Sequence, residues 1–416
     1  MKDVSESLKE KVLNELKPKE VLDLACRLVK IPSENPPGDV SEISGFIEDY
    51  LSEEGIMVER HEPAKGRINL IARIGGKSGK ELIFNGHMDV VPAGDRSRWR
   101  FDPFLGEIKD GYILGRGASD MKGGLAGIIY AFRKLAKYEK ELGGRLTLAC
   151  VSDEETGGEY GTKYLVSRGI AVGSAALIAE PTGLDLINVG EKGALWMKIT
   201  VYGKPAHGSL SPYVGESAIL KAADLMKELL KITELKPTLP QELKAVVEES
   251  KRIGEQVIGV KNVGRILDHL SINFGVIRGG TKINMVPEKC ELEVDVRVPI
   301  GMRSDEVASY IEEIVSRYGG KVSYIGRSDA NHTPPSAEIV KVARSNISQI
   351  IGVEPKLFVQ WASSDARYYR WKGVPTIHYG PAEAGVIHGY DEMVKAEDVV
   401  KACMVYAAIA LDYLKQ

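Results

Sequence analysis

Residues 82–89 read LIFNGHMD, and residues 117–125 read GASDMKGGL. The first segment is an apolar run that ends at His87 and Asp89, and the second places Asp120 just before an apolar repeat with helical spacing. A short apolar run of this kind is typical of a strand that is buried on both faces of a parallel sheet. The stretch therefore predicts a strand, a loop and a helix, with one histidine and two carboxylates at the edge of a buried sheet.

Other apolar runs stop at acidic residues in the same way. Residues 145–151 precede the pair Glu154 and Glu155, and residues 174–179 precede Glu180. Helical patterns separate these runs, and the helix-then-strand alternation returns after residue 334. Strands that alternate with helices at this spacing predict an α/β class protein with a doubly wound catalytic domain.

A different pattern occupies the middle of the chain. Residues 195–201 alternate between apolar and polar side chains, which is typical of a sheet with one buried face. The elements that follow have the order β-α-β-β-α-β, as in the ferredoxin-like arrangement. We therefore predict that residues 1–188 and 329–416 form the catalytic domain and that residues 189–328 form an inserted lid and dimerisation domain. A long polar helical stretch, 233–270, extends that insertion.

Composition excludes several classes of partner. The 416 residues carry a net charge of −3, so no basic field attracts nucleic acid or anionic lipid. No apolar run approaches the ~20 residues that cross a bilayer. The N-terminal residues lack the apolar segment of a secretory signal, so we expect a cytoplasmic protein. The four cysteines are scattered and indicate reduced core residues.

Seven polar residues are predicted to gather beyond the carboxyl ends of the strands, where open α/β sheets bind ligands. They are His87, Asp89, Asp120, Glu154, Glu155, Glu180 and His388. Each alone has an ordinary explanation as a capped loop residue or a solvated turn. Together they would be costly to hold without a cation, and imidazoles with carboxylates suit zinc, cobalt or manganese. We interpret their common target as a pair of metal ions.

Two local features leave alternatives. Asp89 lies two residues beyond His87, so its carboxylate could accept the second ring N–H of that histidine, or it could simply form a turn. The glycines around Asp120 contain neither GxGxxG nor GxxxxGK[ST], so a nucleotide site is not indicated.

Six motifs resemble those of one family. They are GHMDVVP (86–92), GRGASDMKGG (115–124), DEETG (153–157), EPT (180–182), PAHGS (205–209) and HGYDE (388–392). They are similar to the signatures of the acetylornithine deacetylase and succinyl-diaminopimelate desuccinylase family of di-zinc hydrolases. Aminoacylases and carboxypeptidases belong to it as well. The resemblance covers nearly the whole chain.

The resemblance implies a set of metal ligands. Two zinc ions per subunit, or cobalt or manganese in their place, would be bridged by Asp120. One ion would be completed by His87 and Glu180, the other by Glu155 and His388. Glu154 would be the general base, Asp89 would orient His87, and the peptide bond after Asp120 would be cis.

The resemblance also implies residues that contact the substrate. His207, in the insertion, would stabilise the tetrahedral oxygen across a homodimer, although a histidine in such a loop is by default an exposed polar residue. Asn284 and Arg297 would hold the substrate carboxylate, and Ser363, Ser364 and Asp365 resemble a substrate-side loop. An arginine on an alternating strand is otherwise a solvated or ion-paired one. The other histidines, at positions 61, 269, 332 and 378, are predicted to be surface or packing residues.

These inferences lead to one main hypothesis and its rivals. We expect a metal-dependent amidohydrolase that removes an acetyl or succinyl group from an amino acid or diamino acid. Its partners would be a small N-acyl amino acid or short peptide and a second copy of the chain. A metallo-exopeptidase, either carboxypeptidase or dipeptidase, is the alternative within the class. A catalytically silent metal-dependent binding protein is the rival of another class, and Glu154 argues against it. A nucleotide-using enzyme comes third.

Overall fold

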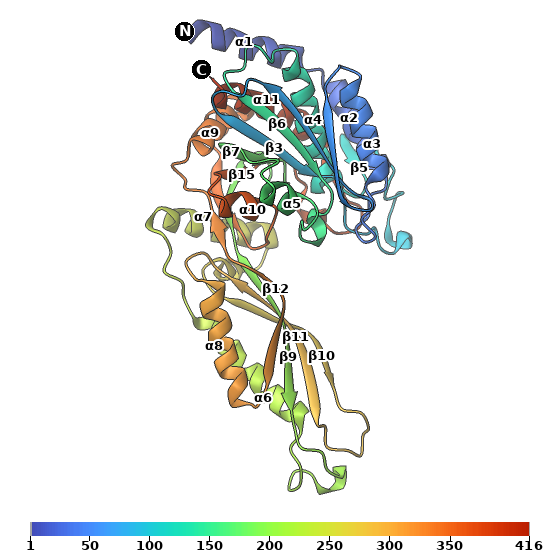
Figure 1. Ribbon diagram of the computed structural model, residues 1–416, viewed down its shortest axis with the longest axis vertical. Helices are drawn as coiled ribbons and strands as arrows, with labels where there is room; N and C mark the ends of the chain where they lie inside the picture. Colours follow the sequence, from blue (N-terminus) through green and yellow to red (C-terminus); the bar gives the residue numbers. More distant parts are fainter. Residues whose placement is uncertain (1, 416) are drawn as a thin grey trace. The chain divides into compact units, whose positions relative to one another are not determined.

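The computed structural model describes residues 2–415, which form two compact units (Figure 1). One unit comprises the chain up to Val189, Thr333–Phe358 and the chain from Ser364 onward. The other comprises Gly190–His332 and Val359–Ser363. Among residues 2–415, no helix combines the length and apolar character that crossing a membrane requires. The role of residues 189–328 as a lid and dimerisation domain stays a prediction.

The first unit is built on a large mixed sheet. Its strand order is β1 (Val58–Ala64), β2 (Arg67–Gly75), β6 (Arg145–Val151), β3 (Glu81–His87), β7 (Ala175–Ile178), β15 (Thr376–His378) and β8 (Leu186–Glu191), with β14 (Lys356–Gln360) also paired with β8. The last two residues of β8 pair with β13 (Asn331–His332), and these four residues belong to the second unit. The four central strands β6, β3, β7 and β15 run parallel to one another, whereas β1 with β2, β2 with β6, β15 with β8, and β8 with β13 pair antiparallel. The predicted α/β class is confirmed, but the sheet is mixed and not parallel throughout.

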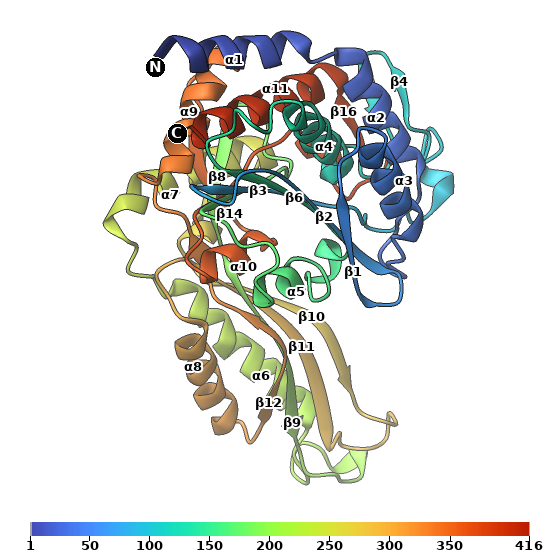
Figure 2. The same cartoon turned by 45° about the horizontal axis from the view of Figure 1, so that its top comes forward.

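Helices cover both faces of this sheet. They are α1 (Lys2–Glu15), α2 (Pro18–Lys30), α3 (Ser41–Ser52), α4 (Gly123–Ala136), α5 (Thr162–Ser167), α9 (Glu338–Ile351), α10 (Ala366–Trp371) and α11 (Ala396–Tyr413). Figure 2 shows α4 and α11 on one face and α5 with α10 on the other. Helix α4 is buried almost all round, and a side chain at Gly127 would collide with the ring of Tyr406 on α11. This glycine lets the two helices approach closely.

The register of the parallel strands brings their polar ends to one edge. His87 pairs with Val151, the last residue of β6, and Asn85 pairs with Ile178, the last residue of β7. The residues that follow each strand therefore emerge side by side. This is the arrangement that the apolar runs predicted.

A small sheet was not predicted. Its strands are β4 (Glu107–Lys109), β5 (Tyr112–Leu114) and β16 (Met393–Lys395), in the order β16-β5-β4. Asp110 and Gly111 connect β4 with β5 and have φ values of 51° and 82°. An Asp-Gly turn of this kind is a hairpin signal. The pairing of β5 with β16 has no local signal, because these strands are far apart in the sequence.

The second unit is a four-stranded antiparallel sheet with helices. The strands are β9 (Gly193–Tyr202), β10 (Ser271–Gly279), β11 (Lys289–Val298) and β12 (Lys321–Ser328), in the order β10-β11-β9-β12. The core combines the alternate apolar residues of β9 with those of α6 (Ala218–Leu230) and α8 (Ser304–Arg317). The predicted element order is confirmed. Within the stretch 233–270 lies α7 (Lys244–Ile258), which the β-α-β-β-α-β pattern does not include.

Lys192 ties this extra segment to the start of the sheet. It is buried and lies between β8 and β9. Its Nζ donates hydrogen bonds to the backbone oxygens of Ile266 and His269, the latter at 2.9 Å, and lies 3.4 Å from Ser271 Oγ. A buried ammonium group requires such acceptors, because water no longer solvates it.

Lys192 is expected to make the stability of the second unit depend on pH. Burial, together with the charge of Arg297, lowers the pKa of Lys192 to about 7. An unfolded chain keeps an ordinary lysine pKa of about 10.4, so between these values it binds more protons than the folded chain. The free energy of unfolding should therefore rise as pH increases through this window. Below a pH of about 7, Lys192 is protonated in both the folded and the unfolded chain, and this gain in the free energy of unfolding is lost.

The comparison of wild type with Lys192→Met checks this expectation. Urea unfolding of both proteins at about pH 6 and about pH 9 gives the difference in free energy of unfolding. That difference should shift in favour of the wild type at the higher pH, because the variant has no group to titrate at this position. A difference that does not change with pH would contradict the role of Lys192.

Candidate metal centre

Five segments of the first unit supply the predicted metal ligands and the predicted general base. His87 is the last residue of β3, and Asp120 lies in the turn Ala118–Lys122 that leads into α4. Glu154 and Glu155 begin the turn after β6. Glu180 follows β7, and His388 lies in the loop before β16. The edge of the sheet at which these side chains were predicted to gather is therefore where the structure places them.

The side chains form two groups that share Asp120. Oδ1 of Asp120 lies 3.1 Å from Nε2 of His87, and Oδ2 lies 3.2 Å from Nε2 of His388. His87 Nε2 is also 3.8 Å from Glu180 Oε1, and His388 Nε2 is 3.2 Å from Glu155 Oε2. Each oxygen of Asp120 thus faces one imidazole, and each imidazole has a second carboxylate beside it.

This donor set fits a pair of divalent cations. The ligand atoms of His87, Asp120 and Glu155 lie within 4.8 Å of one another, and so do those of His87, Glu154 and Glu180. Among residues 2–415, no hydrogen-bond partner is found for Oε1 of Glu155, although this atom is buried. Buried carboxylates that lack partners are costly, and a cation would satisfy them. Imidazole nitrogen with carboxylate oxygen is a set that zinc and similar metals accept.

The pKa values follow from burial and from crowding of negative charge. Burial raises the pKa of Glu154 well above its ordinary value, and the charge of Glu180 adds to this effect. Burial alone would lower the pKa of His87, but its hydrogen bond to Asp120 and the charge of Glu180 hold it well above the usual range. Hydrogen bonds to Asp120 and Glu155 raise the pKa of His388 to about 10. A bound cation would displace these protons, because ligands bind metals in their deprotonated forms.

The spacing of Asp89 and His87 left open whether Asp89 orients the ring of His87 or only forms a turn. The oxygen nearest to Nδ1 of His87 is the backbone carbonyl of Asp89, at 2.9 Å, whereas the carboxylate oxygen lies at 3.6 Å. The carboxylate instead accepts the backbone N–H groups of Glu154 and Glu155, at 3.2 and 3.3 Å. It also accepts a hydrogen bond from Asn35 at 2.8 Å. Asp89 therefore holds the loop of the two glutamates as well as the ring of His87.

Asn35 was not identified from the sequence. Its amide nitrogen links Asp89 to Thr156 Oγ1, at 2.9 Å, and so connects the N-terminal loop with the turn after β6. Its only local signal is its place in the turn-forming run Asn-Pro-Pro-Gly (35–38). The cis peptide bond predicted after Asp120 is present between Asp120 and Met121.

Most of the predicted substrate residues lie in the second unit. His207 and Asn284 lie in neighbouring segments. Gly208 N–H donates to the backbone oxygen of Asn284 at 2.8 Å, and the backbones of His207 and Met285 form an isolated antiparallel β-bridge. The Nδ1 of His207 lies 2.8 Å from Ser209 Oγ.

The remaining predicted contacts, Arg297, Ser363, Ser364 and Asp365, are held in place by other groups. The carboxylate of Asp365 accepts a hydrogen bond from the hydroxyl of Thr162 at 2.6 Å. Arg297 pairs with Asp295, and its guanidinium lies 5.7 Å from the ring centre of Trp196. Ser363 donates to the backbone oxygen of Lys192 at 2.9 Å. Ser364 belongs to the first unit and lies 3.0 Å from Nε2 of the buried His378. The roles of these residues in substrate binding stay predictions.

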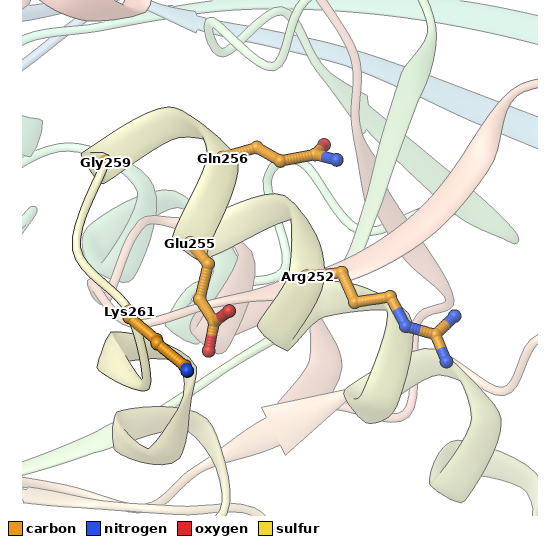
Figure 3. Close-up of a pocket in the computed structure, with 5 residues that line it drawn as sticks. All are labelled: Arg252, Glu255, Gln256, Gly259 and Lys261. Carbon is orange, nitrogen blue, oxygen red and sulfur yellow. The ribbon is translucent and has the colours of Figure 1, made fainter.

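A hollow outside this centre holds none of the predicted site residues. It is lined by Arg252, Glu255, Gln256, Gly259 and Lys261. Figure 3 shows that these residues come from the last turns of α7 and the segment after it. Glu255 accepts the backbone N–H of Asn262, and Arg252 pairs with Glu249, so these two charged groups have partners of their own.

Curated relatives match over nearly the whole chain. A succinyl-diaminopimelate desuccinylase from a Nitratiruptor species is 30% identical, and the alignment covers 94% of this chain and 99% of that protein. A probable succinyl-diaminopimelate desuccinylase from Staphylococcus aureus (strain MSSA476) is 27% identical, with 96% and 98% covered.

Solved structures share the fold. The M20 family metallo-carboxypeptidase Sso-CP2 from Sulfolobus solfataricus aligns with a TM-score of 0.80 at 20% identity, over 95% of this chain and 99% of that one. The YXEP protein of Bacillus subtilis, described as a dinuclear metal binding peptidase from the M20 family, aligns with a TM-score of 0.65 at 16% identity, over 95% and 98%.

A family model matches most of the chain. The model of peptidase family M20/M25/M40 matches residues 83–412, a range that contains all the predicted metal ligands. The resemblance inferred from the six motifs is thereby confirmed, and with it the expectation of a hydrolytic enzyme. The chain belongs to peptidase family M20/M25/M40.

Proposed function

We propose that this protein is a di-zinc amidohydrolase that removes an acetyl or succinyl group from the nitrogen of an amino acid or diamino acid. The observation that carries the proposal is the position of Asp120, whose two oxygens face His87 and His388 at 3.1 and 3.2 Å. A carboxylate in this position can bridge two cations. The names of the curated relatives support the proposal that the acyl group removed can be a succinyl group, because they describe desuccinylases.

Each side of Asp120 would hold one ion. His87 and Glu180 complete one ligand set, and Glu155 and His388 complete the other. Two such ions would lower the pKa of a bound water toward neutrality and would polarise the scissile carbonyl. Zinc is our first choice, and cobalt or manganese would fit the same donors.

Glu154 moves the proton in the proposed reaction. Its backbone is fixed by Asp89, and its side chain lies within the group formed with His87 and Glu180. As general base it takes the proton of the attacking water, and as general acid it returns that proton to the departing amine. The high pKa that burial gives to this carboxyl suits it to holding a proton between the two steps.

Residues of the second unit anchor the substrate and stabilise the transition state in this proposal. His207 donates a hydrogen bond to the tetrahedral oxygen in the site of a neighbouring subunit, so the working form is a homodimer through residues 189–328. Asn284 and Arg297 hold the substrate carboxylate, for which Arg297 would have to exchange its present partner Asp295. Ser363, and Ser364 of the first unit, contribute from the loop before α10. The place of action is the cytoplasm.

A metallo-exopeptidase is the second candidate. The same centre hydrolyses any amide whose carboxylate side fits the anchor, and Sso-CP2, which has the same fold, is a carboxypeptidase. The two candidates differ in the group on the carbonyl side of the scissile bond.

The experiment uses the full chain, freed of metal by a chelator and reloaded with zinc, cobalt or manganese. We expect two ions per chain by elemental analysis and hydrolysis of N-succinyl or N-acetyl amino acids only after reloading. The panel also contains dipeptides with a free carboxylate, and a preference for these would favour the exopeptidase. Absence of stoichiometric metal, or no cleavage of any amide by reloaded protein, would overturn the proposal.

A further inference from the structure

Arg116 and Glu392 form a buried ion pair beneath two of the loops that carry metal ligands. Nη1 of Arg116 lies 2.5 Å from Oε2 of Glu392, and the side chains are only 2% and 0% exposed. The pair belongs to the first unit, and neither residue offers a ligand atom to the proposed centre. Its function must therefore be sought in what the two side chains touch.

Glu392 holds the backbone of the bridging ligand. Its second oxygen, Oε1, accepts the backbone N–H groups of Ser119 and Asp120, at 3.1 and 3.0 Å. These bonds fix the backbone of Asp120, whose carboxylate lies between His87 and His388. Hydrogen bonds to a charged carboxylate are roughly twice as strong as those between neutral groups.

Arg116 holds the other ligand loop. Its Nη2 donates to the backbone oxygen of Gly389 at 2.8 Å, directly after His388. The side chain of His388 is 51% exposed and its φ is 59°, so the walls of a closed pocket do not determine its position. The backbone of its loop has to do so. One planar guanidinium therefore connects the loop of His388 with the carboxylate that holds Asp120.

Ser119 reinforces the same connection. Its hydroxyl donates to the backbone oxygen of Met393 at 3.0 Å and accepts the N–H of Glu383 at 2.8 Å. The segments around Asp120 and His388 are thus joined by side-chain bonds that do not involve any metal ligand atom. A buried ion pair contributes little to stability compared with an apolar pair of the same size. Stability alone therefore does not explain this pair.

We propose that Arg116 and Glu392 are positioning residues that set the geometry of Asp120 and His388 before a metal ion binds. The proposal rests on the metal centre assigned above. A ligand set that is already in place loses less conformational freedom on binding, so the pair increases metal affinity without touching the metal. The ion held by Glu155 and His388 should depend most on this pair. Two of its ligands are Asp120, whose backbone Glu392 holds, and His388, whose loop Arg116 holds.

The test is a metal titration of the metal-free protein carrying Glu392→Gln. Cobalt is the probe, since its visible absorption reports both occupancy and ligand geometry. We expect the dissociation constant of at least one of the two ions to rise by about 10- to 100-fold, the range seen when groups behind metal ligands are removed. Amide hydrogen exchange of residues 119 and 120 in the metal-free variant should become faster than in the metal-free wild type.

Asp412→Asn is the matched control. Asp412 pairs with Lys9 at 2.9 Å in the same unit, and both side chains are largely buried. This variant loses an ion pair of similar kind but should bind cobalt as the wild type does. If Glu392→Gln does not fold, Glu392→Asp serves in its place, because it keeps the charge and shortens only the reach toward Ser119 and Asp120.

The outcomes separate the two proposals. A wild type that binds no stoichiometric cobalt would overturn the proposed function itself. A wild type that binds two ions, beside a folded Glu392 variant with the same affinities and exchange rates, would overturn the positioning role alone. Weaker binding in the Glu392 variant, with unchanged binding in the Asp412 control, is the result that supports it.

Discussion

Replacing Glu154 with glutamine is expected to lower turnover by about 10²- to 10⁴-fold while the protein keeps two metal ions per chain. The amide has nearly the shape of the carboxyl group but cannot take a proton from water. Glu154 lies close to His87 and Glu180, yet the two pairs of contacts around Asp120 do not include it. Its loss should therefore affect proton transfer and not metal binding.

Steady-state kinetics and elemental analysis of the same preparation measure the two quantities together. Glu159→Gln is the control, since Glu159 follows in the same loop but pairs with Lys163 at the surface. It should keep both metal and turnover. Unchanged turnover in Glu154→Gln would remove this residue from the reaction. Loss of metal would instead make it a ligand.

Replacing His207 with alanine is expected to reduce turnover by about 10²- to 10³-fold, as the loss of one donor to the tetrahedral oxygen does in other hydrolases. His207 lies in the second unit, beside the segment of Asn284, whereas every proposed metal ligand lies in the first. Metal content should therefore stay at two ions per chain. His61→Ala is the control, because His61 pairs with Glu59 on β1 and has no proposed role.

Mixed dimers decide whether His207 acts across subunits. A dimer of one Glu154→Gln chain and one His207→Ala chain contains one site with both groups intact only if His207 serves the neighbouring site. Random mixing of the two inactive variants should then restore about a quarter of the wild-type activity. A mixture that stays inactive would assign His207 to the site of its own chain.

The sequence predicted best those elements whose burial is visible as a run or a regular spacing of apolar residues. Strand β6 was predicted with both of its ends, because an uninterrupted apolar run reflects burial directly. Helix α5 and the three short strands β4, β5 and β16 were missed. They span only three to six residues each, too few for a periodicity to emerge, and tertiary contacts stabilise them.

The same division holds for the metal centre. The sequence by itself determined which residue types follow the buried strands, and hence the fold class and the set of candidate ligands, because a parallel sheet aligns its carboxyl ends. The six motifs indicated the family. Only the tertiary structure decided that Asp120 faces a different histidine with each oxygen, and that the carboxylate of Asp89 accepts backbone N–H groups. It alone also placed Glu392 under Asp120, a contact between residues 272 positions apart. Such contacts depend on how distant segments pack, and no local pattern encodes the direction in which a side chain then points.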